Sequence, residues 1–72
     1  MTVIEFPSLR DKLISHIKAR TGGRLTNLLV KLSRDEVVLH GEANSFYVKQ
    51  LAQQGVRELL PEVRLENAIV VA

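Results

Sequence analysis

Residues 28–42 of the chain read LLVKLSRDEVVLHGE, and this stretch decides the fold. Apolar and polar residues alternate on both sides of the polar pair Arg34-Asp35. Alternation with a period of two predicts two paired strands, which we place at 25–33 and 36–42, joined by a tight turn. The expected inner face carries Leu28, Val30, Leu32, Val37 and Leu39, and the outer face carries Leu29, Lys31, Glu36, Val38, His40 and Glu42.

Helix-capping residues flank this hairpin on both sides. Ser8 with Asp11 has the spacing of a capping box and Gly22 suits a C-cap, which predicts a helix over 8–21. A second helix is expected over 45–60, beginning at Asn44-Ser45 and stopped by Pro61. The expected apolar stripes are Leu9, Leu13, Ile14 and Ile17 on the first helix, and Val48, Leu51, Ala52, Gly55 and Leu59 on the second.

A final strand is expected over 63–71, and residues 1–7 form an N-terminal tail. The element order α-β-β-α-β predicts an α+β fold in a single domain spanning 1–72. Two helices would cover one face of a three-stranded sheet, as a two-layer sandwich. The order of the strands in the sheet is left open, and the sheet is mixed if the second and third strands are neighbours.

Four residues have an unusual place in this pattern. Gly41 on the inner face permits close approach of another backbone or helix, and mid-helix Gly55 predicts close helix–sheet packing. Asn67 interrupts an apolar face, so it sits at a bulge or hydrogen-bonds a buried backbone group. Phe46 is expected to cover the first turn of its helix, with a binding anchor as the alternative.

Charge is unevenly distributed along the 72 residues, although the net charge is only +2. The first half carries a clear excess of basic residues and the second half an excess of acidic ones. A basic first half is typical of a surface that attracts anionic partners, and the simpler alternative is a solvated face. The candidate anionic-surface patch consists of Lys12, Lys18, Arg20 and Arg24.

The N-terminal sequence lacks the features of a signal peptide, and no apolar run is long enough to span a bilayer. As written, the chain is therefore expected to be cytoplasmic, or envelope-associated if it is part of a larger protein. The absence of cysteine removes any disulfide framework.

No catalytic motif, metal site or cofactor motif is recognised. His16 and His40 lie in different elements, and two ligands do not make a zinc site. Glu36, His40 and Glu42 form either a small titrating cluster or ordinary cross-strand pairs, and we favour the pairs. Gly22-Gly23-Arg24 follows a helix, which favours a C-cap and turn over a phosphate-binding loop. We expect no enzymatic activity, no cofactor and no small-molecule substrate.

Residues 8–71 resemble a BON domain, a small bacterial module. The resemblance rests on the element order, on the strand that ends at Gly41, on the helix beginning at Asn44-Ser45, and on the closing strand at 65–71. Asp35 stands in the hairpin turn where the family usually has glycine. The resemblance implies a non-catalytic module found in bacterial envelope proteins, which binds phospholipid surfaces or other proteins. It carries over no individual binding residue.

Three functions follow as hypotheses. The first is an interaction module that binds a protein partner or an anionic phospholipid surface. The second is a nucleic-acid-binding domain that uses the basic half, although Phe6, Phe46 and Tyr47 lie outside the predicted strands. The third is self-association as a homo-oligomer. The candidate interface residues are Leu29, Val38, Val70 and Phe46.

Overall fold

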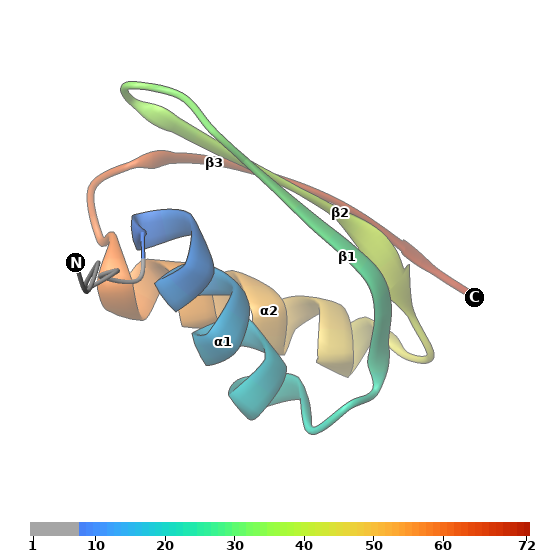
Figure 1. Cartoon of the computed structure of the whole chain (residues 1–72). Helices are drawn as coiled ribbons and strands as arrows, with labels where there is room; N and C mark the ends of the chain where they lie inside the picture. Colours follow the sequence, from blue (N-terminus) through green and yellow to red (C-terminus); the bar gives the residue numbers. More distant parts are fainter. Residues whose placement is uncertain (1–7) are drawn as a thin grey trace, which may run out of the picture.

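The computed structural model describes residues 8–72, so the predicted tail at 1–7 lies outside the described residues. Its elements are α1 (Leu9–Thr21), β1 (Leu25–Leu32), β2 (Glu36–Ala43), α2 (Phe46–Leu59) and β3 (Arg64–Val71) (Figure 1). The predicted order α-β-β-α-β and α+β class are confirmed.

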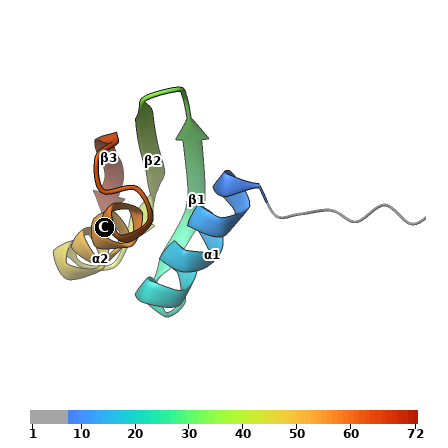
Figure 2. The same ribbon diagram turned by 90° about the vertical axis from the view of Figure 1, so that its left-hand side faces the viewer.

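The sheet has the order β1-β2-β3, which the sequence alone left open. β1 and β2 form an antiparallel hairpin, and β2 pairs with β3 in parallel, so the sheet is mixed. Figure 2 shows both helices on one side of the sheet, with α1 beside β1 and α2 beside β3. The expected two-layer arrangement is therefore confirmed. Within the described part of the chain, neither helix has the length and apolar character needed to cross a membrane.

Both helices begin at the predicted serine caps. The Ser8 hydroxyl accepts a hydrogen bond from the backbone N–H of Asp11 at 3.1 Å. Ser45 does the same for Val48 at 3.2 Å. At the other end of α1, Gly22 adopts the left-handed conformation with φ of 58° and donates its N–H to the Lys18 carbonyl. These caps satisfy backbone groups that a helix end leaves without partners, so short helices of this kind are stabilised where they begin and end.

A β-bulge in β1 was not anticipated from the sequence. The pairing with β2 shifts between Thr26 and Leu29, and Asn27 adopts a positive φ of 55°. Two residues of β1 stand opposite one residue of β2 there, which reverses the alternation of side chains. Leu25 and Leu28 consequently both pack against the core although they are an odd number of residues apart.

Gly41 lies opposite this bulge. A Cβ atom added to Gly41 would lie 3.0 Å from the backbone oxygen of Thr26 and 3.5 Å from that of Asn27. The expected close approach at Gly41 is therefore confirmed, and the approaching group is the backbone of β1.

The core lies between the sheet and the two helices. Its fully buried large side chains include Leu13, Ile17, Val30, Val37, Leu39, Val48, Val56 and Ile69. The predicted inner face of the hairpin is confirmed: Val30, Val37 and Leu39 are buried, and Leu28 and Leu32 pack half-buried against the core.

Three predictions about helix faces were wrong. Leu9 is 47% exposed and Leu59 is 40% exposed, because each lies in a terminal turn of its helix, where the packing against the other layer ends. Val56, one turn earlier on α2, is buried although the predicted stripe did not include it. Phe46 is 63% exposed, so it does not cover the first turn of α2.

The packing partner of Gly55 also differs from the prediction. A Cβ atom added to Gly55 would meet Ile17 Cγ1 at 3.5 Å and His16 Cδ2 at 3.6 Å, and both residues belong to α1. The glycine therefore allows close helix–helix packing and not helix–sheet packing. The two helices lie side by side over a narrow sheet, so the middle of α2 faces its neighbouring helix.

Asn67 sits in regular strand pairing, since the register between β2 and β3 runs without a shift. Its side-chain amide donates to the backbone oxygen of Lys49 in α2 at 3.0 Å. Of the two alternatives for Asn67, the structure thus supports a hydrogen bond to a backbone group, which ties β3 to the helix that covers it.

Candidate interaction surface

Two neighbouring aromatic side chains are exposed at the start of α2. Phe46 is 63% exposed and Tyr47 is 60% exposed, and they are the first two residues of the helix after the Ser45 cap. Val48, the next residue, is fully buried. The helix therefore begins with its buried stripe at Val48 and directs the two preceding side chains away from the core.

Arg24 lies beside this aromatic pair. Its guanidinium carbon is 5.8 Å from the centre of the Tyr47 ring, within the range of a cation–π interaction. The Arg24 Nε also donates to the Thr21 carbonyl at 3.0 Å, which holds the side chain against the end of α1. The loop at Gly22 thus brings a cation from the end of α1 onto an aromatic ring at the start of α2.

Lys49 completes the group, since it lines the same shallow groove as Phe46 on the surface of α2. We call Arg24, Phe46, Tyr47 and Lys49 the aromatic end of the domain. A neighbouring groove of about 400 Å³ is lined by Arg24, Glu42 and the C-terminal Ala72, among others. Glu42 is hydrogen-bonded to the Asn27 amide at 2.7 Å. Arg24, Phe46 and Tyr47 of the aromatic end are exposed, and Lys49 is half-buried beside Phe46.

The four residues of the predicted basic patch are not gathered at one place. Arg20 forms an ion pair with Glu58 of α2 at 3.2 Å and a hydrogen bond with Gln54 at 3.2 Å. Lys12 lies two turns nearer the start of α1 than Arg20, and Lys18 is exposed on a different side of that helix. Of the four, Arg24 lies beside an exposed aromatic ring, that of Tyr47.

The outer sheet face carries three of the four predicted interface residues. Leu29 is opposite His40, Val38 lies between Lys31 and Glu66, and Val70 is beside Glu42. Polar or charged neighbours therefore separate the three apolar side chains. Phe46, the fourth, belongs to the helix layer and not to this face.

The two histidines have separate surroundings. His16 Nε2 and the Glu58 carboxylate are 2.7 Å apart, so this pair joins α1 to α2 beside Arg20. His40 lies on the outer sheet face with Glu36 and Glu42 on the same strand, as expected. Among residues 8–72, no group of three or more histidine, cysteine, aspartate or glutamate residues could hold a metal ion.

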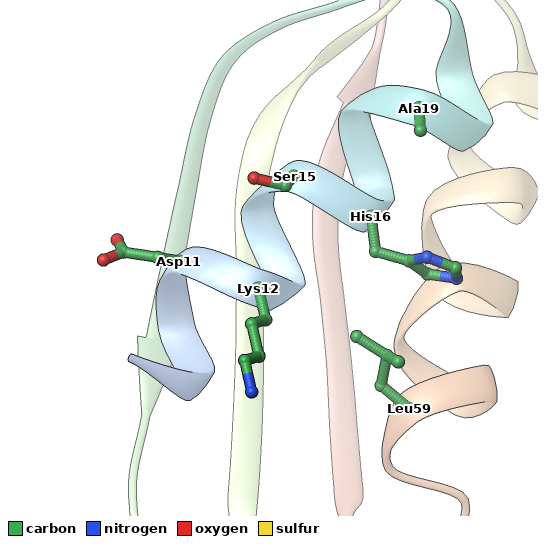
Figure 3. Close-up of a pocket in the computed structure, with 6 residues that line it drawn as sticks. All are labelled: Asp11, Lys12, Ser15, His16, Ala19 and Leu59. Atoms are coloured by element: carbon green, nitrogen blue, oxygen red, sulfur yellow. The ribbon is translucent and has the colours of Figure 1, made fainter. Parts of the chain in front are cut away.

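A third groove, of about 520 Å³, runs along the outside of the helix pair (Figure 3). The residues that line it are Asp11, Lys12, Ser15, His16 and Ala19 of α1 and Leu59 of α2. Asp11 is the acidic residue in this lining, and His16, which also lines the groove, is bound to Glu58. This arrangement offers no nucleophile with an adjacent base and no cluster of cations.

Sequence reasoning missed the role of Tyr47, Lys49 and Glu58. The two aromatic residues directly after the Ser45 cap were a usable signal, because Phe46 and Tyr47 fall outside the apolar stripe that begins at Val48. The pairing of Glu58 with His16 and Arg20 had no comparable signal, since it depends on how the two helices are aligned.

No family model, curated protein or solved structure matches this chain in the comparisons.

Proposed function

We propose that this domain is a non-catalytic interaction module of the BON type, which docks onto an anionic phospholipid surface through its aromatic end. One observation carries the proposal: Phe46 and Tyr47 are both exposed, with the Arg24 guanidinium 5.8 Å from the Tyr47 ring. Adjacent exposed aromatic side chains form an apolar patch, and exposed apolar patches of sufficient size mark interaction sites.

The chemistry of these residues suits a lipid headgroup region. Aromatic rings lie at the boundary between headgroups and acyl chains, where tyrosine keeps its hydroxyl in water. Arginine and lysine beside them attract anionic headgroups, each contributing about 1 kcal/mol near the membrane surface. Arg24 and Lys49 together would then favour anionic over neutral lipid by about 2 kcal/mol, or about 30-fold in affinity.

Two further points support this reading. The resemblance of residues 8–71 to BON domains implies binding to phospholipid surfaces or to proteins, without catalysis. In addition, the described strands contain no phenylalanine, tyrosine or tryptophan, so the sheet offers no platform for stacking nucleic-acid bases. A lipid surface therefore fits the aromatic end better than RNA or DNA does.

Vesicle co-sedimentation tests the proposal. We expect the protein to pellet with vesicles of phosphatidylcholine mixed with phosphatidylglycerol, and to remain in solution with phosphatidylcholine alone. The double variant R24Q/K49Q should lose most of this binding. The matched double variant K12Q/K18Q removes the same charge from α1 and should bind nearly as well as the wild type.

Binding that is indifferent to lipid charge and to salt would contradict the proposal. An equal loss in both double variants would contradict the placement at the aromatic end, because it would show that net charge alone decides binding. Failure to bind any vesicle would leave a protein partner as the occupant of the aromatic end and would overturn the lipid assignment.

A further inference from the structure

Both outer edges of the sheet are open among the described residues. β1 and β3 each pair only with β2, so each directs one row of backbone N–H and C=O groups away from the sheet. Such an edge is a template on which a strand of another chain can pair.

The hydrogen bonds of β3 show which of its residues face the open edge. The N–H groups of Arg64 and Ala72 donate to the carbonyls of Asp35 and Ala43, at 3.0 and 2.9 Å. Even-numbered residues of β3 therefore direct their backbone groups toward β2. Since successive residues alternate, the odd-numbered residues direct theirs outward, and Ile69 is one of them.

The outward N–H of Ile69 is already occupied. Asn67 Oδ1 accepts a hydrogen bond from it at 3.2 Å. The same side chain donates through Nδ2 to the Lys49 carbonyl at 3.0 Å and lies 3.5 Å from Gln53 Oε1. Lys49 and Gln53 of α2 thus hold the Asn67 amide at the edge of β3. The amide oxygen occupies the Ile69 N–H, which is a backbone donor that a newly paired strand would need.

The segment next to Asn67 is well suited to pairing with another strand. Ala68-Ile69-Val70-Val71 is uncharged, rich in β-branched residues and free of glycine and proline. Val70 is 61% exposed and Val71 is 40% exposed. An exposed edge segment of this composition is prone to intermolecular β-pairing unless a neighbouring residue prevents it.

The opposite edge has an equivalent contact. The N–H of Ser33 donates to the carbonyl of Glu36, so the odd-numbered residues at this end of β1 direct their backbone groups toward β2. Because successive residues alternate, Val30 directs its backbone groups outward. Arg10 Nε of α1 donates to the Val30 carbonyl at 3.0 Å. The β1 edge thus carries a charged side chain, whereas a neutral amide alone makes the corresponding contact on β3.

We propose that Asn67 prevents β3 from pairing edge to edge with β3 of a second copy of this chain. Without the amide, two copies of β3 would pair antiparallel about Ile69, with the helices of both copies on the same side of the joint sheet. Residues 66–72 would overlap in this register, and Glu66 would stand opposite Ala72. Within residues 66–72, no two charged side chains would then stand opposite each other across the new pair.

Amide hydrogen exchange on the wild-type protein is the first test. The Ile69 N–H should exchange at least about fivefold more slowly than the Leu65 N–H, which also faces the edge, because a hydrogen bond of ordinary strength protects it. Equal exchange at Ile69 and Leu65 would overturn the proposal, and this result does not depend on any variant folding.

The variant N67L, in which leucine has the branched shape of asparagine but lacks its hydrogen bonds, is the second test. Sedimentation equilibrium should show the wild type as a monomer and N67L as a dimer whose fraction rises with concentration. The Ile69 amide of N67L should exchange rapidly in dilute samples and become protected as the dimer forms. Q50L, which adds the same leucine to the exposed side of α2, should remain a monomer.

A strictly monomeric N67L with an intact sheet would overturn the proposal. The Ala68 and Val70 amides face β2, so their protection from exchange shows that the sheet is intact. Dimerisation of Q50L to the same extent would also overturn the proposal, because added apolar surface would then explain the association.

Discussion

Gly55 of α2 faces Ile17 of α1 so closely that a Cβ atom added to the glycine would lie 3.5 Å from Ile17 Cγ1. This distance is ordinary van der Waals contact and not a clash. The two helices therefore pack closely at Gly55 but retain room for one methyl group.

Gly55→Ala should for this reason stabilise the domain. Alanine is favoured over glycine inside a helix by about 1 kcal/mol, and the added methyl group meets Ile17 without displacing it. We expect the free energy of unfolding, measured by urea denaturation, to rise by about 0.5–1 kcal/mol. A decrease would show that Ile17 and His16 cannot accommodate the methyl group.

Gly41→Ala should have the opposite effect. The added Cβ would lie 3.0 Å from the backbone oxygen of Thr26, at the bulge, where the backbone cannot move without breaking strand pairing. We expect a loss of about 1–3 kcal/mol in the same denaturation experiment. Gly41→Ala and Gly55→Ala make the same chemical change, so each is the control for the other. An equal effect from both would contradict the packing described at the two glycines.

Glu58 joins the helices by accepting from His16 and Arg20, at 2.7 and 3.2 Å. These side chains are about one-third to one-half exposed, so the pairs are screened by solvent and salt. Glu58→Gln should lower the free energy of unfolding by no more than about 1 kcal/mol, and less at high salt.

Glu62→Gln is the matched control for this change, because Glu62 makes no ion pair with another described residue. The control should leave stability unchanged. A similar loss in both variants would show that net charge, and not the link between the helices, explains the effect.

The sequence predicted the elements and their arrangement because local signals agreed with one another. Alternation around Arg34-Asp35 indicated the hairpin, and Ser8 and Ser45 indicated the helix starts that the structure confirms. The bulge at Asn27 escaped notice, since the positive φ of one exposed residue leaves no mark on the hydrophobic pattern. Leu59 was misassigned because helical periodicity does not show where the covering element ends.

The candidate surface was less predictable than the fold. Charge along the chain indicated a basic first half, but the structure turns Arg20 toward Glu58 and Arg24 toward Tyr47. Such contacts join residues more than 20 positions apart, so no local spacing reveals them. The exposure of Phe46 and Tyr47 did leave a signal in the sequence, because both residues precede the apolar stripe that begins at Val48.

The most direct test of lipid docking uses the variant Phe46→Trp, because the wild-type chain contains no tryptophan. Its fluorescence would report on the aromatic end alone, and Leu29→Trp, on the exposed outer face of the sheet, is the matched control. With vesicles containing phosphatidylglycerol, we expect a blue shift and protection from aqueous quenchers for Phe46→Trp only. An unchanged spectrum for Phe46→Trp while the protein still pellets with these vesicles would contradict docking through the aromatic end.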